Sequence, residues 1–567
     1  MRHQSILVSF TSLLITGLCA AQPTFSEPIT IDPPKQQRID ALFKDLDRPN
    51  SPGCALGVMN DGALAYARGY GYAVLDSAVP IDSSKLFELA SVSKHFTAAA
   101  IVLLAQQGKL SFTDDVRKYL PELPSYGTPI TVNHLLWHTS GLRDYVYMNF
   151  LAGHVYSDVS TQQQVLDLIV KQRKLDFPTG TRYRYSNTGY FLLGLIVERV
   201  SGKSLNDFSR ETLFTPLGMP NATLRDKHDK PIPNQALGYA PDGTGGYAIF
   251  MSNWEQVGPT GVQMSIDELQ RWDENFYEPR VGGPKFVEEM LHRGRLDNGR
   301  PLIYARGLHV DRYRGLRRVR HGGDSFGYHA NLVRFPDQHT TIALTCNAEG
   351  IDQYTLSRKV IDIVLEDAFT QPPDEDAPSG DPLPAQQLTG HYFDRSQKEV
   401  VDVTLENGGL VLKFLYLSLP LVAKGPTTFS LEGFPNSRVE FNVPEGGQAQ
   451  SVKIVFEKED VDDTPVVGTR FTPVVNSSPE SYAGSFQSPE LGVSWKLSVE
   501  SGQLTLENTP ALVALPVAGP LSGGTEPDSF YSSAGFLQFT RDASGQVNGF
   551  NLSINGQIDY RFDMERL

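Results

Sequence analysis

Two residue types that can act together in nucleophilic catalysis stand one helical turn apart in this chain. Ser91 and Lys94 precede an apolar run, residues 96–105, that ends near Gly108 and predicts a buried helix. Residues i and i+3 of a helix share a face, so the Lys94 amine is expected beside the Ser91 hydroxyl. A buried lysine amine has a lowered pKa and can remove the serine proton, or orient the group that does. The pair predicts a serine nucleophile, although two fixed letters alone are a weak signal.

Two further groups of polar and glycine residues follow in order along the chain. Tyr185 and Asn187 precede the apolar residues 190–197, which predict a second buried helix, so both are expected on a turn at its start. The third group precedes two strand-like segments and consists of His321, Gly322 and Gly323. Each group alone has an ordinary structural interpretation, as a core aromatic or a turn. Their order is the informative feature.

In this order, the three groups resemble the motif set of the penicillin-recognising serine hydrolases, S-x-x-K, S-D-N and K-T-G. Tyrosine in the second motif points to the class C β-lactamase branch, with its esterases and D-aminopeptidases. Residues 135–142, Leu-Leu-Trp-His-Thr-Ser-Gly-Leu, also match a signature of that branch. The resemblance covers about residues 35–370. It implies a β-lactamase/transpeptidase-like fold, an α/β lobe and an all-helical lobe, with the site between them.

The resemblance implies a role for each residue of the first two motifs. Ser91 would form an acyl-enzyme, and Tyr185 would be the general base, its phenol pKa lowered by the Lys94 cation. Whether Lys94 or Tyr185 takes the first proton stays open. Asn187 would donate to a substrate carbonyl. The oxyanion hole would consist of the backbone N–H groups of Ser91 and Asp324.

The third motif departs from the penicillin pattern because a histidine replaces the lysine. His321 has an ordinary pKa near 6.5 and is mostly neutral at pH 7, so it attracts a substrate carboxylate less than a lysine would. Gly322 and Gly323 would let a substrate approach the strand backbone closely. The departure favours esters, amides or peptides over β-lactams, with His321 and both glycines as substrate-binding residues.

A competing nucleophile overlaps this motif. Gly323-Asp324-Ser325-Phe326-Gly327 matches G-x-S-x-G, the nucleophile elbow of α/β-hydrolases. That elbow lies between a strand and a helix, whereas the residues after Ser325 predict a strand and a turn. We therefore expect Ser91, and not Ser325, to be the nucleophile.

The N-terminus predicts export. Residues 1–21 combine Arg2, an apolar stretch and Cys19-Ala20-Ala21, which is typical of a secretory signal peptide. The apolar stretch is too short for a confident membrane span, and no other stretch could cross a bilayer. We expect a secreted or periplasmic protein.

Composition narrows the choice of partners. The formal net charge of −15 disfavours nucleic acid and anionic membranes, and no Cys/His spacing indicates zinc, so we expect no metal and no cofactor. Cys54 and Cys346 remain after signal removal. The family fold places their strands side by side, which leaves open either a disulfide or two buried thiols.

Beyond a hydrolase domain predicted over residues 30–368 and a linker over 369–387, the pattern changes to short alternating strands. It repeats: Gly390-His391-Tyr392 recurs as Gly484-Ser485-Phe486. The repeat predicts two all-β barrel-like domains, residues 388–474 and 480–567, each an up-and-down barrel of about eight strands. The layout resembles that of D-aminopeptidases, in which a barrel loop reaches the active site. Alternatively, the barrels are lids, spacers or homodimer contacts.

These observations predict a secreted serine hydrolase that acts through an acyl-enzyme on a small amide, peptide or ester, with D-aminopeptidase-like action as the specific expectation. An esterase or a β-lactamase of the same family is one alternative. The other is a penicillin-binding-like sensor that is acylated without turnover.

Overall fold

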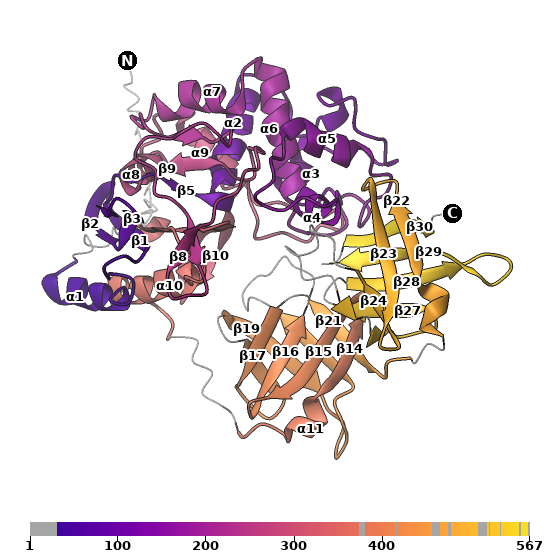
Figure 1. Cartoon of the computed structure of the whole chain (residues 1–567). Helices are drawn as coiled ribbons and strands as arrows, with labels where there is room; N and C mark the ends of the chain where they lie inside the picture. Colours follow the sequence, from indigo (N-terminus) through magenta and orange to yellow (C-terminus); the bar gives the residue numbers. More distant parts are fainter. Residues whose placement is uncertain are drawn as a thin grey trace, which may run out of the picture.

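The computed structural model describes residues 31–372, 380–414, 417–431, 434–455, 465–474, 478–507, 519–520, 522–532, 535–554 and 557–564. The predicted signal peptide lies outside these ranges, as does part of the predicted linker. Figure 1 shows a domain of sheet and helices followed by two all-β units. No helix in the described part of the chain is long and apolar enough to cross a membrane.

A six-stranded antiparallel sheet is the centre of the first domain, with strand order β10-β11-β12-β13-β1-β2. Its strands are β1 (Cys54–Asn60), β2 (Ala63–Tyr70), β10 (His309–Tyr313), β11 (Leu316–Ser325), β12 (Tyr328–Phe335) and β13 (Thr340–Cys346). Strands β1 and β13, from opposite ends of the domain, are paired with Cys54 opposite Cys346, and a disulfide joins the two residues. Every residue of both strands is buried, because helices cover both faces of the sheet.

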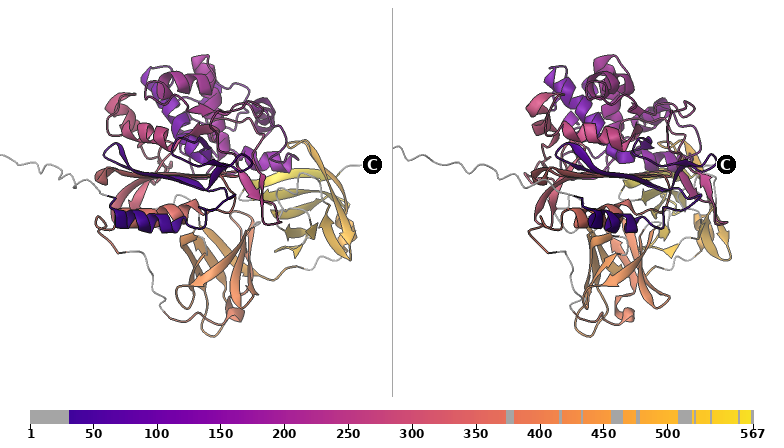
Figure 2. Two further views of the ribbon diagram at one scale, coloured as in Figure 1. Left: turned by 60° about the vertical axis from the view of Figure 1, so that its left-hand side comes forward. Right: turned by 90° about the vertical axis from the view of Figure 1, so that its left-hand side faces the viewer.

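Figure 2 shows the layers edge-on, with α1 (Pro33–Leu42) and α10 (Gln353–Val364) below the sheet and the helical lobe above it. The lobe contains α2 (Lys94–Gln106), α3 (Val132–Leu136), α4 (Tyr145–Leu151), α5 (Gln162–Val170), α6 (Asn187–Ser201), α7 (Leu205–Ser209), α8 (Ile266–Glu274) and α9 (Gly283–Met290). The first domain also has short strands outside the six-stranded sheet: β3 (Tyr72–Val74), β4 (Val79–Pro80), β5 (Phe87–Glu88), β6 (Thr223–Leu224), β7 (Tyr239–Pro241), β8 (Tyr247–Ile249) and β9 (Val262–Met264). Helices α2 and α6, which carry the first two motifs, are buried along most of their length because their sequences are apolar nearly all round.

The first all-β unit follows the short helix α11 (Ala385–Leu388) and is a closed barrel in which neighbouring strands pair in chain order. Its strands are β14 (Gly390–Asp394), β15 (Glu399–Glu406), β16 (Gly409–Phe414), β17 (Leu417–Ala423), β18 (Thr428–Leu431), β19 (Phe434–Asn442), β20 (Ser451–Val455) and β21 (Val466–Phe471). Alternate residues point inward, as Val401 and Val403 of β15 do. The prediction of an up-and-down barrel is confirmed for this unit.

The second all-β unit is a nine-stranded sheet and is not closed within the described residues, so the expected eight-stranded barrel is only approximated here. Its strands are β22 (Gly484–Ser488), β23 (Val493–Glu500), β24 (Gln503–Leu506), β25 (Gly519–Pro520), β26 (Ser522–Gly523), β27 (Ser529–Ser532), β28 (Gly535–Arg541), β29 (Val547–Ile554) and β30 (Gln557–Met564). The two edge strands of this sheet, β25 and β26, are neighbours in the chain. The predicted fold class, a β-lactamase-like domain followed by two β domains, is confirmed.

Side-chain contacts connect the three parts. The Arg184 side chain of the first domain donates to Gln397 of the barrel over 2.7 Å. His391 of the barrel lies 2.9 Å from the Tyr531 hydroxyl of the second unit. The β-units therefore contact both the first domain and each other.

Candidate active site

Ser91 lies in a short 3-10 turn, Ala90–Ser93, that leads directly into α2. Strand β11 packs against this turn at Gly323. A Cβ atom added there would lie 2.4 Å from the Leu89 carbonyl oxygen and 2.9 Å from the Ser91 nitrogen. Only glycine fits so close an approach, and it brings the strand backbone to the Ser91 amide.

The Lys94 ammonium nitrogen is fully buried and has three oxygen neighbours. Nζ lies 3.1 Å from Ser91 Oγ, 2.9 Å from Asn187 Oδ1 and 3.0 Å from the Pro259 carbonyl oxygen. The two carbonyl-type oxygens can only accept hydrogen bonds. A neutral Lys94 amine therefore uses both its N–H groups on Asn187 and Pro259, which leaves its lone pair directed at the Ser91 hydroxyl.

Burial lowers the pKa of Lys94 from its ordinary value of 10.5 to about 7, although the nearby Asp144 carboxylate partly opposes this shift. Near neutral pH a substantial share of the molecules thus carries a neutral amine in contact with Ser91. Lys94 is placed and poised to take the serine proton.

Tyr185 lies two residues before α6 begins, and its hydroxyl makes a hydrogen bond with the Ser91 side chain. Its ring lies 4.7 Å from Lys94 Nζ and 4.4 Å from the His138 ring. The sequence analysis expected the Lys94 cation to lower the Tyr185 pKa, but burial raises that pKa instead. Desolvation disfavours a phenolate here, so Lys94 fits the first proton transfer better than Tyr185 does.

Asn187 begins α6, and Asp144 fixes the orientation of its amide. Asp144 Oδ2 accepts from the Asn187 backbone N–H over 2.9 Å and from Nδ2 over 3.0 Å. With Nδ2 directed at a carboxylate, Oδ1 must face Lys94. Burial raises the Asp144 pKa, while these N–H donors and Lys94 lower it.

The His321 side chain is directed into the protein and does not line the cavity described below. Its Nδ1 donates to the Gly322 carbonyl oxygen over 2.6 Å, so the neutral ring accepts at Nε2 from the Tyr304 hydroxyl, 3.0 Å away. Burial holds its pKa well below the ordinary value, and the ring is neutral. A Cβ at Gly322 would collide with the Tyr354 ring, 2.3 Å away. The sequence analysis expected a substrate to approach the backbone at Gly322, but the Tyr354 side chain packs there.

Asp324 and Ser325 complete β11 and both line the cavity. The Asp324 carboxylate accepts from His329 Nδ1, Gln353 Nε2 and the Tyr354 hydroxyl over 2.8, 2.7 and 2.9 Å. After Ser325 the chain turns directly into β12, which pairs with β11, so no helix follows as a nucleophile elbow requires. The Ser325 side chain makes its hydrogen bond with Glu88.

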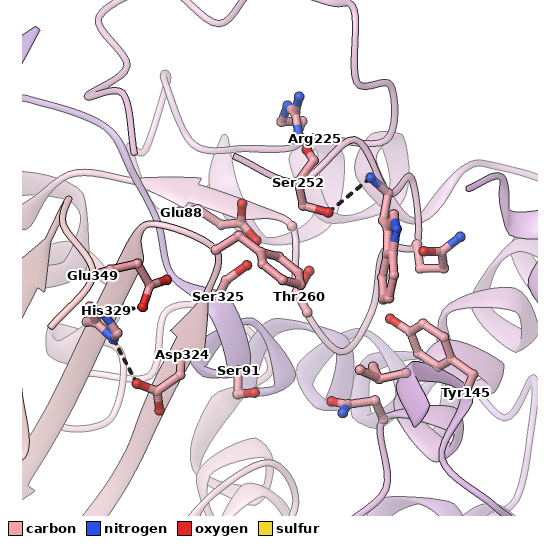
Figure 3. Close-up of a pocket in the computed structure, with 16 residues that line it drawn as sticks. Glu88, Ser91, Tyr145, Arg225, Ser252, Thr260, Asp324, Ser325, His329 and Glu349 are labelled. Atoms are coloured by element: carbon pink, nitrogen blue, oxygen red, sulfur yellow. Dashed lines mark hydrogen bonds and ion pairs between the residues drawn. The ribbon is translucent and has the colours of Figure 1, made fainter. Parts of the chain in front are cut away.

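The cavity at Ser91 has a volume of about 300 Å³ (Figure 3). It is lined by Glu88, Ser91, Tyr145, Val146, Asn187, Arg225, Ser252, Trp254, Gln256, Thr260, Gly261, Asp324, Ser325, Phe326, His329 and Glu349. Figure 3 shows Glu349 and Asp324 on either side of His329. The described residues of both β-units are absent from this lining, and no cluster of ligands suited to a metal ion occurs in the described part of the chain.

The sequence analysis named Asp324 for its backbone N–H, but it named neither Asp144 nor two other acidic residues, Glu88 and Glu349, that line the cavity. The sequence could have predicted Asp144 as a helix N-cap, because it immediately precedes an apolar helical run. In the structure this run is α4, and the Asp144 carboxylate accepts from the Val146 N–H over 2.9 Å. Glu88 and Glu349 come from segments far apart in the chain, and only the fold brings them together.

The Beta-lactamase family profile matches residues 39–364, more than half of the chain. The chain belongs to the β-lactamase family. Penicillin-binding protein 4* of Bacillus subtilis (strain 168) is 29% identical over 444 residues, which cover 75% of this chain and 97% of that protein. The D-aminopeptidase of Gluconobacter oxydans (strain 621H) is 25% identical over 391 residues, 68% of this chain and 71% of that protein.

Among solved structures, the octameric penicillin-binding protein homologue from Pyrococcus abyssi superposes with a TM-score of 0.54 at 22% identity, covering 76% of this chain and 99% of that one. This likeness shows the shared fold. Together with the family match, the curated relatives identify this β-lactamase family member as a serine hydrolase.

Proposed function

We propose that this protein is a D-aminopeptidase-like amidase in which Ser91 is the nucleophile and Lys94 the general base. The arrangement around Lys94 Nζ carries the proposal: two acceptors occupy its N–H groups, and the third neighbour is Ser91 Oγ at 3.1 Å. A pKa of about 7 makes the neutral amine available near neutral pH.

The reaction follows from this placement. Ser91 Oγ attacks the amide carbon while its proton moves to Lys94 Nζ, and the resulting oxyanion accepts from the N–H groups proposed at Ser91 and Asp324. As the C–N bond breaks, the leaving nitrogen receives a proton from Lys94 or through the Tyr185 hydroxyl. Water then attacks the ester carbon and gives a proton to Lys94. As the bond between this carbon and Ser91 Oγ breaks, Lys94 returns that proton to Ser91 Oγ, which releases the carboxylic acid product and the neutral amine.

The charges in the cavity favour a substrate with a free amino group. Three carboxyl groups, those of Glu88, Asp324 and Glu349, line it together with one guanidinium, that of Arg225. Burial raises the pKa of Glu88, whereas the pKa of Asp324 is lowered, because hydrogen bonds from other side chains outweigh the effect of burial. An ammonium group suits this cavity better than a carboxylate does. The similarity to a D-aminopeptidase agrees with this preference.

The aromatic side of the cavity favours an apolar acyl group. Trp254 and Phe326 both line it, with ring centroids 5.9 Å apart, and Phe326 also stacks on Tyr156 at 5.2 Å. These contacts give the wall a fixed shape, against which an apolar side chain can be buried. We propose amides and short peptides of apolar D-amino acids as the substrates.

A second candidate is acylation by penicillin-type ligands without turnover, because the chain covers 97% of a relative named as a penicillin-binding protein. Against it, His321 of the third motif supplies no cation to the cavity, since its ring is neutral and does not line it. A burst of acylation followed by no further product would favour this candidate over the amidase.

A turnover panel tests the proposal. It contains a D-alanyl anilide, its L isomer, a short-chain aryl ester and a chromogenic cephalosporin, each with the wild type and Ser91→Ala. The amidase proposal predicts the highest kcat/KM for the D anilide and none for the variant. Preference for the ester or the cephalosporin would move the assignment to an esterase or a β-lactamase.

We also propose that the protein is exported, and the Cys54–Cys346 disulfide supports this, because disulfides persist mainly in oxidising compartments. A homodimer through the β-units stays a prediction, which the molar mass in solution tests.

A further inference from the structure

The second β-unit contacts the first domain at a buried arginine that immediately precedes Asp144. Arg143 Nη1 donates to Glu490 Oε2 and to Gln172 Oε1, both over 2.8 Å. The Arg143 guanidinium also lies 4.2 Å from the centre of the Tyr560 ring. The Arg143 side chain is only 1% exposed. Figure 1 shows β22 and β30 of the second unit beside α4, which begins just after this arginine.

The backbone at Arg143 is connected to the active site by an unbroken series of short contacts. The Arg143 carbonyl oxygen accepts from Thr188 Oγ1 over 2.6 Å, and Thr188 follows Asn187 in α6. The Asp144 carboxylate holds both the backbone and the side-chain nitrogen of Asn187. Asn187 Oδ1 in turn accepts from Lys94. The path from Glu490 to Lys94 thus runs through Arg143, Asp144 and Asn187.

We propose that the second β-unit is a positioning element of the active site: Glu490 and Tyr560 fix Arg143 and Asp144, and these residues hold the Asn187 amide in the orientation that directs Lys94 at Ser91. The inference rests on the proposed roles of Ser91 and Lys94. Glu490 and Tyr560 touch no reacting atom and act only through Arg143.

The burial of Arg143 is the reason this contact should affect catalysis. A buried guanidinium needs its charge partners. Glu490 Oε2 lies 2.8 Å from Nη1, whereas Asp176 Oδ1 lies 3.6 Å from Nε. Without Glu490, we expect the Arg143 side chain to shift toward solvent or toward Asp176. Asp144 follows Arg143 directly in the chain, so this shift also moves Asp144. A small displacement there misdirects the Asn187 amide.

The pH dependence distinguishes positioning from a simple contact between domains. The ionisable groups around Lys94 in the described chain are Asp144, Tyr185, Tyr190, His138 and His321. Burial keeps both histidines neutral and both tyrosines protonated, which leaves Asp144 as the charge that favours the Lys94 ammonium. Moving Asp144 away lowers the Lys94 pKa.

The experiment measures the rate at which an alkyl fluorophosphonate labels the full-length protein between pH 5 and pH 9. The variants are Glu490→Gln, which keeps the shape, and Tyr560→Leu, which removes the aromatic face by an independent route. The matched control is Glu507→Gln, because Glu507 forms a 2.8 Å ion pair with Lys496 in the same unit. Thermal unfolding is recorded for each variant.

We expect Glu490→Gln and Tyr560→Leu to lower the limiting labelling rate about 10-fold or more and to move its acid limb to lower pH, while Glu507→Gln stays like the wild type. An unchanged rate and an unchanged acid limb in both variants would overturn the inference, even if the unfolding temperature fell. If the wild type itself is not labelled at Ser91, the proposed function fails instead.

Discussion

The pKa of Lys94 gives a quantitative prediction for the pH dependence of acylation. With a pKa of about 7, half of the Lys94 amines are neutral at pH 7, and about 1% are neutral at pH 5. Because only the neutral amine can take the Ser91 proton, the acylation rate should fall about 50-fold between these pH values. A lysine with the ordinary pKa of 10.5 would be neutral in only about one molecule in 3,000 at pH 7.

Single-turnover acylation between pH 5 and pH 9 measures this fall in rate, the acid limb of the pH profile, directly. The leaving group released from an aryl ester or anilide is followed by stopped flow. Asp144→Asn is the accompanying variant. It removes the carboxylate that raises the Lys94 pKa, so the acid limb should move to lower pH while the limiting rate falls, because Asn187 loses its fixed orientation. A rate that does not change with pH would refute Lys94 as the base, and a rate that still rises steeply at pH 9 would refute its lowered pKa.

Three further predictions concern single features of the structure. Tyr185→Phe should lower kcat by about 10²-fold, because the hydroxyl bonded to Ser91 is lost; near-normal kcat would assign all proton transfers to Lys94. Replacing both Cys54 and Cys346 by alanine should lower the free energy of unfolding by up to about 5 kcal/mol, since the disulfide closes a separation of 292 residues; denaturant unfolding without a change in midpoint would contradict this. His321→Lys should destabilise the protein by several kcal/mol through an unpaired buried charge, without improving capture of a cephalosporin; unchanged thermal unfolding would contradict the buried placement.

The sequence predicted the parts of the site that depend on local geometry. Ser91 and Lys94 are neighbours because helical spacing alone brings them together. Tyr185 and Asn187 were predicted at a helix start, and they lie there. The fold class of the first domain followed from the family resemblance that the ordered motifs carry, and the two β domains followed from the repeated strand pattern.

The remaining features depend on long-range packing, which spacing does not reveal. The direction of the Tyr185 pKa shift depends on how deeply α6 packs, and burial outweighs the Lys94 charge. His321 does not line the cavity, and its ring is bonded instead to the hydroxyl of Tyr304, which comes from a separate segment. The acceptor at Pro259 is a backbone oxygen, which a search for side-chain motifs cannot detect.

The identity of the nucleophile is the central claim, and one measurement tests it most directly. The wild-type protein is labelled with the fluorophosphonate and digested, and the modified residue is identified by peptide mass. The account predicts an adduct on Ser91 alone, which is lost in Ser91→Ala and retained in Ser325→Ala. An adduct on Ser325, which lines the same cavity, would contradict the account.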